Sequence, residues 1–158
     1  MPEEAKYLRF NWLIPRVLAG GPHPDLSGGL PNVAPFLHAR GIGGIVTVHE
    51  KPLAPSPEDL GFRYLFAETP DYQPPLELAR ILDFIGEERS RGLGTLVHCF
   101  AGIGRTGTVL AAWLLREERS LSASEAICRV RGEYIPEYAR SRFPESNEQE
   151  DALERFAR

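Results

Sequence analysis

The sequence predicts an α/β fold: a three-layer sandwich in which a short, mostly parallel central sheet is flanked by helices. Short apolar or β-branched runs next to glycine, such as 44–48 and 94–98, are typical of strands buried on both faces. These runs alternate with stretches of helical periodicity, which favours a parallel sheet with short connections. Since 158 residues suit one domain, we expect a single domain over residues 1–158.

Turn residues and the spacing of apolar residues define the individual elements. Pro15 separates two short apolar runs, and Gly41 and Gly92 end two helical stretches. Ser122 and Glu125 form a capping box, which indicates the start of a helix. In chain order we expect strands at 11–14 and 17–19, a helix at 32–40, strands at 44–48 and 63–66, a helix at 76–89, a strand at 94–98, and helices from Thr106 on, at 122–131 and at 147–158.

Composition limits what the protein can bind. The net charge is -4, so no global positive field gathers nucleic acid or an anionic membrane. The first residues lack an apolar signal core and no stretch approaches the length of a membrane span, so we expect a cytoplasmic protein. Cys99 and Cys128 lack the spacing of a zinc site, and we expect two free thiols, no metal or other cofactor, and a monomer.

The loop between the strand at 94–98 and the following helix is the strongest functional candidate. A helix start directs backbone N–H groups and the positive end of the helix dipole toward one point, which favours an anion. Arg105 adds a planar fork that can hold two phosphate oxygens. Glycines let the loop curl, so that a nest of amides faces a phosphate, from Phe100, Ala101, Gly102, Ile103, Gly104 and Arg105.

Cys99 at the rim of this nest indicates catalysis as well as binding. The amides, the dipole and the arginine stabilise a thiolate, which can attack phosphorus and form a phosphocysteine. Arg105 and the amides can then follow the equatorial oxygens through the transition state without a metal. Thr106 can offer its hydroxyl to the sulfur when the sulfur leaves.

The leaving group needs a proton, and Asp71 is the candidate acid. It lies in a proline-rich loop after the strand predicted at 63–66, and its carboxylate could later deprotonate the hydrolytic water. Spacing alone does not separate Asp71 from Glu68 and Asp59, which are also near.

These residues resemble a known family. Cys99, five residues and then Arg105-Thr106-Gly107 are similar to the signature of the protein tyrosine phosphatase superfamily. His98 and the run 101–104 resemble the small atypical dual-specificity phosphatases, in which a Pro-Asp-aromatic loop carries the general acid. Residues 70–74 match that loop, which favours Asp71. The resemblance covers about residues 10–131.

The resemblance implies the cysteine phosphatase fold and hydrolysis of phosphotyrosine, and of phosphoserine or phosphothreonine, in proteins or as small phosphate monoesters. It implies that His98 tunes the thiolate through hydrogen bonds to the loop. It also implies that a glutamine early in the last helix orders substrate or water, and Gln149 is its match. The segment 132–146 departs from the family pattern, and we expect it to border the site.

Three other functions remain open. A phosphatase of non-protein substrates such as phosphoinositides is disfavoured because Phe100, Ala101 and Ile103 are uncharged where such relatives tend to carry lysine. A pseudophosphatase would commonly lack the cysteine, the arginine or the acid, and all three are present. A dinucleotide-binding module fits Gly102-x-Gly104-x-x-Gly107 but needs an acidic residue at the end of a following strand.

Simple structural roles are expected for several other reactive residues. Cys128 lies within a predicted helix, where a free cysteine packs like a small hydrophobe, so we expect it in the core. Glu50 follows the strand predicted at 44–48 and could help to shape the pocket, but we expect a salt-bridged surface turn instead. We expect surface or loop positions for His23, His38 and His49.

Overall fold

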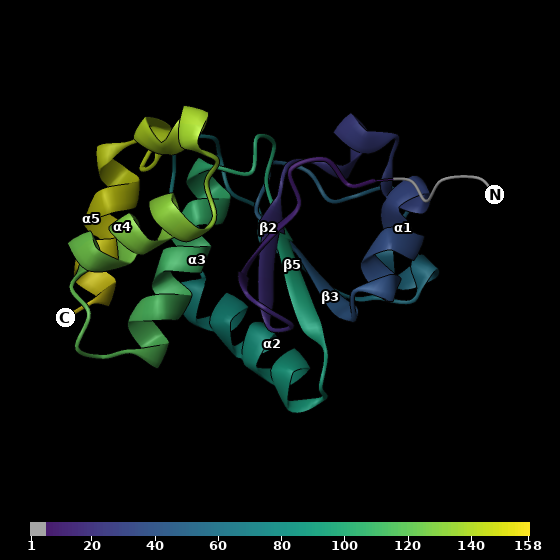
Figure 1. Cartoon of the computed structure of the whole chain (residues 1–158), viewed down its shortest axis with the longest axis horizontal. Helices are drawn as coiled ribbons and strands as arrows, with labels where there is room; N and C mark the ends of the chain where they lie inside the picture. Colours follow the sequence, from purple (N-terminus) through teal and green to yellow (C-terminus); the bar gives the residue numbers. More distant parts are fainter. Residues whose placement is uncertain (1–5) are drawn as a thin grey trace.

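A computed structural model describes residues 6–158 as an α/β sandwich (Figure 1). Five strands form one sheet in the order β1-β2-β5-β3-β4. β1 pairs antiparallel with β2, and the other three pairings are parallel. The predicted fold class is confirmed. The strands are β1 Asn11–Ile14, β2 Leu18–Gly21, β3 Ile42–Thr47, β4 Arg63–Phe66 and β5 Gly94–His98.

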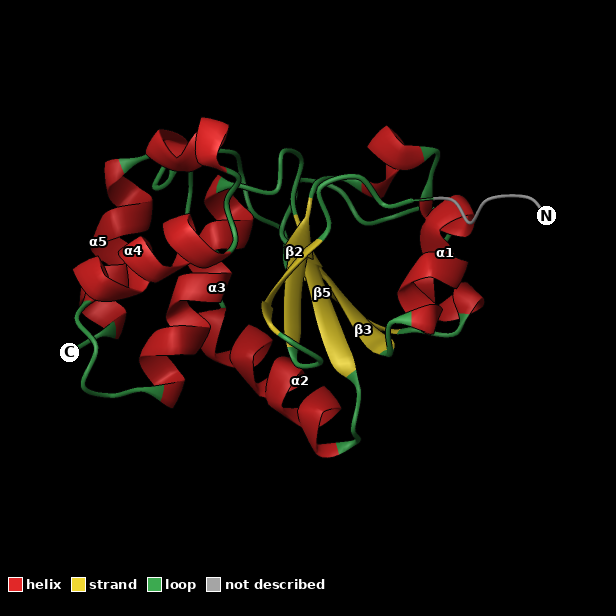
Figure 2. Ribbon diagram, in the orientation of Figure 1, coloured by secondary structure: helices red, strands yellow, loops and turns green. Residues whose placement is uncertain are grey.

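The helices cover the two faces of the sheet unequally. α1 lies on one face, whereas α2 and α3 pack on the other, and α4 and α5 pack against α3 (Figure 2). The helices are α1 Leu30–Ala39, α2 Leu78–Ser90, α3 Gly104–Glu117, α4 Ala123–Glu133 and α5 Asn147–Phe156, and 3-10 segments occupy Pro24–Ser27, Pro57–Leu60 and Glu137–Arg142. No helix within residues 6–158 combines the length and apolar character that a membrane crossing requires.

Most boundaries agree with the sequence to within two residues. α1 begins at Leu30, earlier than expected, because Pro31 fits the first turn of a helix and leaves Pro35 inside it. Ser122 and Glu125 form the predicted capping box at the start of α4. The 3-10 segments were not expected, since such short turns carry no apolar periodicity.

Cys128 is exposed, so its expected place in the core is wrong. The buried residues of α4 are Ala123, Ala126, Ile127 and Val130. Their spacing of three and four residues marks one helix face, and a position directly after Ile127 points about 100° away from it.

Candidate functional site

The central strand β5 delivers Cys99 to the carboxyl edge of the sheet. β5 lies between β2 and β3, to which it is parallel, so the ends of three strands meet there. Cys99 follows β5 directly and is 2% exposed. Its Sγ accepts a hydrogen bond from Thr106 Oγ1 at 3.1 Å, in the first turn of α3. The predicted strand, loop and helix are therefore confirmed around this cysteine.

Four successive carbonyl groups of the loop are bound from outside it. The Cys99 carbonyl lies 3.0 Å from His98 Nδ1, and the Phe100 carbonyl accepts from the backbone N–H of His23 at 2.8 Å. The remaining two, from Ala101 and Gly102, accept from Arg9 Nη1 at 2.9 Å and from Tyr134 Oη at 2.8 Å. Because the C=O and N–H of a trans peptide point in opposite directions, the amides of these peptides face the inner side.

The inner side has the character of an anion site. Gly102 adopts φ 75°, where a side chain would be strained, and a β-carbon there would also lie 2.6 Å from the backbone of Gly21. α3 begins at Gly104 with no side-chain hydrogen bond from its N-cap residue, Ile103, so its positive end faces the inner side. The loop can therefore cradle a phosphate.

Arg105 extends from the first turn of α3 and is 3% exposed. Its Nη1 donates to the Thr69 carbonyl at 2.9 Å and to Glu50 Oε1. Nη2 lies 3.5 Å from Asp71 Oδ1, and the buried Nε has no hydrogen-bond partner among the described residues. One edge of the guanidinium is thus anchored, while Nε is left to donate to a phosphate oxygen.

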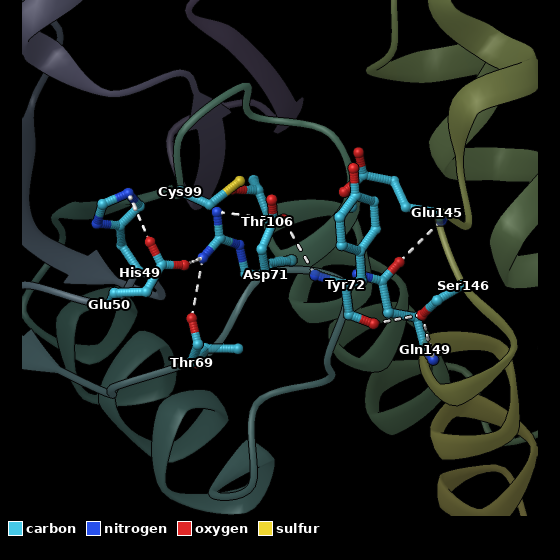
Figure 3. A network of polar contacts seen from close by, with 12 residues as sticks. His49, Glu50, Thr69, Asp71, Tyr72, Cys99, Thr106, Glu145, Ser146 and Gln149 are labelled. Carbon is cyan, nitrogen blue, oxygen red and sulfur yellow. Dashed lines mark hydrogen bonds and ion pairs between the residues drawn. The ribbon is translucent and has the colours of Figure 1, made fainter.

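Glu50 lies in a salt-bridged surface turn, as expected, and its ion-pair partner joins it to the site. It contacts Arg105 on one side and His49 on the other, whose Nε2 is 3.4 Å from Glu50 Oε2. Figure 3 shows His49 and Glu50 on one side of Cys99 and Glu145, Ser146 and Gln149 on the other. Glu50 follows a strand end, which was the available signal, but only the fold brings Arg105 to it.

Asp71 lies in the loop between β4 and α2, and its side chain is 55% exposed. Its Oδ1 accepts from the backbone N–H of Tyr72 at 3.0 Å, and Tyr72 itself adopts φ 65°. Asp71 therefore joins the site through Arg105, as expected for a group that must reach a bound substrate. The 3-10 segment Pro57–Leu60 holds Asp59, in a different loop.

His98 is a neutral link between the sheet and the loop. Burial, its main perturbation, lowers the pKa of His98 to about 3. Its Nδ1 must carry the proton, because Nδ1 faces the Cys99 carbonyl, while Nε2 accepts from Thr47 Oγ1 at 2.7 Å. Tyr64 Oη in turn donates to Thr47 Oγ1 at 2.8 Å. The contact to the loop that the family resemblance implied for His98 is present.

His23 and His49 lie in loops and His38 lies at the surface, as expected, but the two loop histidines are largely covered. The side chains of His23 and His49 are 14% and 16% exposed, whereas His38 is exposed. The His23 ring packs 5.3 Å from His98, and the His49 ring stacks 6.4 Å from Phe100, whose side chain projects from the loop. Burial lowers the pKa of His23. These rings form one wall of the site.

The segment 132–146 borders the site as expected, through Glu145. The Glu145 carboxylate lies against the amide of Gly104, where any β-carbon would overlap it. Burial and the neighbouring Asp71 raise the pKa of Glu145. Gln149 is buried, and its Oε1 accepts from the backbone N–H of Glu145 at 2.8 Å. Through this hydrogen bond Gln149 orders Glu145 beside the site. The Nε2 of Gln149 has no hydrogen-bond partner within the described residues.

Other ligand chemistries find less support. Within residues 6–158, no group of three or more His, Cys, Asp or Glu side chains could hold a metal ion. α3 leads into α4, so the strand that would end in the acidic residue of a dinucleotide site does not follow Gly107.

Comparisons with known proteins identify the family of the chain. A family model described as "Polymorphic toxin system, DSP-PTPase phosphatase" matches residues 23–119. The dual specificity protein phosphatase CDC14B of Mus musculus is 32% identical over 141 residues, 82% of this chain and 28% of that protein. Dual specificity protein phosphatase 12 of Rattus norvegicus is 35% identical over 89 residues, 53% of this chain and 26% of that protein. The chain thus spans about a quarter of these relatives.

Solved structures share the fold over nearly the whole chain. The crystal structure of Tk-PTP in the active form has a TM-score of 0.76 and 27% identity, and covers 96% of this chain and 98% of its own. The crystal structure of PTPMT1 has a TM-score of 0.75 at 22% identity, covering 94% of this chain and 93% of its own. The chain therefore belongs to the DSP-PTPase phosphatases, the cysteine-dependent, dual-specificity type of protein tyrosine phosphatase.

Proposed function

We propose that this chain hydrolyses phosphate monoesters, phosphotyrosine in proteins first among them, through a phosphocysteine intermediate on Cys99. The observation that carries the proposal is the position of Cys99 in a loop whose first four carbonyl groups are bound from outside. The Cys99 nucleophile, the loop amides and Arg105, which is anchored on one edge, are directed at the same site. Such preorganised donors stabilise the charge that develops in phosphoryl transfer.

In the first step the Cys99 thiolate attacks phosphorus in line with the leaving oxygen. The P–S bond forms, the P–O bond breaks, and Asp71 donates a proton to the departing oxygen. Arg105 Nε and the loop amides hold the equatorial oxygens. The exposed position of Asp71, 3.5 Å from Arg105 Nη2, supports this role because a protein substrate must reach the acid.

In the second step water attacks phosphorus and the P–S bond breaks. The Asp71 carboxylate takes the proton from water, and inorganic phosphate leaves. Thr106 Oγ1, 3.1 Å from Cys99 Sγ, donates a hydrogen bond to the thiolate as it reforms.

The substrate preference rests on the rim of the site. Phe100 and Tyr72 are more than half exposed, and His49 stacks beside Phe100. An aromatic rim offers stacking to a phosphotyrosine ring. Phosphoserine and phosphothreonine would gain less from it, and a phosphoinositide headgroup would meet no lysine from the loop.

Hydrolysis of an aryl phosphate in the presence of EDTA tests the reaction class. We expect the wild-type chain to remain active and Cys99→Ser to lose activity, with Cys128→Ser as the matched control because Cys128 is the exposed second thiol. Activity in Cys99→Ser, or its loss on chelation, contradicts the mechanism. A panel of phosphotyrosine, phosphoserine and phosphothreonine peptides with phosphoinositides then tests the substrate, and preference for the lipid overturns the assignment to proteins.

A further inference from the structure

Tyr134 lies outside the signature motif and yet touches the loop. It follows α4, at the start of the segment that departs from the family pattern, and is 2% exposed. Its hydroxyl donates to the Gly102 carbonyl at 2.8 Å. The ring packs against β2 at Gly20, where a β-carbon would lie 2.6 Å from Tyr134 Oη. The absence of a side chain at Gly20 thus lets the hydroxyl reach the loop.

The peptide that Tyr134 holds has little stiffness of its own. Gly102 has φ 75°, and glycine visits several other backbone conformations at low cost. The Gly102 carbonyl and the Ile103 amide belong to one peptide unit, so a flip would move the carbonyl inward and the N–H outward. The inner side would then present an oxygen to an anion in place of a donor, which opposes both the thiolate and the phosphate.

The Tyr134 hydroxyl is a donor at every pH used for an assay. Burial and the neighbouring Cys99 raise the pKa of Tyr134 far above its usual value, so the proton stays on the oxygen. We propose that Tyr134 is a positioning residue for the proposed reaction, whose hydroxyl keeps the Gly102 carbonyl outside and the Ile103 amide inside the phosphate site. Only the effect of Tyr134 on turnover rests on the proposed function; its effect on anion binding does not.

The chain offers a matched control in Tyr7. This tyrosine is also buried, packs against the next residue of β2, Gly21, and donates its hydroxyl to a backbone carbonyl, that of Pro22. Pro22 lies outside the loop 99–105, and its peptide unit reaches the loop only through the His23 N–H, which donates to the Phe100 carbonyl. Tyr7→Phe and Tyr134→Phe therefore delete the same kind of hydrogen bond, but only the bond of Tyr134 ends on the loop itself.

The proposal can be tested with two measurements that do not depend on turnover. The first is tungstate binding, measured by calorimetry. The second is the rate of Cys99 alkylation by iodoacetamide as a function of pH, measured in a Cys128→Ser background. Since one hydrogen bond is worth about 0.5–1.5 kcal/mol, we expect Tyr134→Phe to weaken tungstate binding by about 2- to 13-fold and to move alkylation to higher pH. Tyr7→Phe acts one hydrogen bond further from the phosphate site, so it should change both readouts less than Tyr134→Phe does, although either variant can lower the melting temperature.

Unchanged tungstate binding in Tyr134→Phe, or an equal loss in Tyr7→Phe, overturns the positioning role. If instead Cys99→Ser retains turnover while Tyr134→Phe still weakens tungstate binding, the proposed mechanism fails and the role of Tyr134 in anion binding stands.

Discussion

The inner and outer faces of the loop 99–105 differ in where their parts come from. The inner face, with Cys99 Sγ, the amides and Arg105, is built by one continuous stretch of sequence. The outer face is held by residues far along the chain, namely Arg9, His23 and Tyr134. The chemistry is therefore local, while the geometry that makes it effective depends on the whole fold.

The largest expected effect comes from the inner face. Arg105→Lys keeps a positive charge but loses the planar fork, so one contact to the equatorial oxygens disappears. Loss of one such donor costs about 10²- to 10³-fold in turnover. Steady-state kinetics on an aryl phosphate measure this. A variant that keeps more than a tenth of kcat would show that charge alone suffices and that the inner face needs no fixed geometry.

Asp71→Asn should show a loss that depends on the leaving group. An alkyl phosphate needs a proton on its oxygen, so we expect its turnover to fall by about 10²-fold or more, whereas p-nitrophenyl phosphate should lose much less. Glu68→Gln, in the same loop, is the control. Equal losses for both substrates would remove Asp71 from the acid role.

The buried His98 should make the outer face sensitive to acid. In the unfolded chain histidine binds a proton near pH 6.5, whereas the folded pKa is about 3, so stability is lost as the pH falls between these values. Between pH 7 and pH 5 this amounts to about 2 kcal/mol. Urea unfolding at both values checks it. His98→Asn, which keeps a donor near the Cys99 carbonyl, should lose less over the same interval, and an equal loss would contradict the assignment.

The smallest effect is expected at Glu145, beside the inner face. Its carboxylate repels an incoming anion, so Glu145→Gln should strengthen tungstate binding by about three- to fivefold. Because the pKa of Glu145 is raised, the wild type should approach the variant as the pH falls toward mild acid. Glu148→Gln, on the exposed side of α5, serves as the control. Weaker binding in Glu145→Gln would show that the carboxyl helps to hold the anion.

The same contrast explains what the sequence could and could not predict. The loop, its strand and its helix were predicted because β-branched residues, glycines and Arg105 lie within a few positions of Cys99. Asp71 was found by its distance from a predicted strand and by a family motif. All of these are local signals that survive without a three-dimensional structure.

Glu145 and Tyr134 carried no such signal, and Glu50 was marked only by its position after a strand. Their importance depends on which segments meet at the carboxyl edge of the sheet. In a sequence, a glutamate or tyrosine at the surface cannot be distinguished from one that lies beside Arg105. Cys128 was misplaced for a related reason, because its helix was recognised while the face turned toward the core was not. A helical wheel anchored on Ala126, Ile127 and Val130 would have placed it outside.

The most direct test of the central claim is to trap the phosphoenzyme. Asp71→Asn should be mixed with an aryl phosphate, whose good leaving group allows the first step while the second lacks its base, then quenched rapidly and digested. We predict one phosphate on the peptide that contains Cys99, and none in Asp71→Asn combined with Cys99→Ser. Phosphate on another residue, or turnover with no labelled peptide at any time, would contradict a phosphocysteine mechanism.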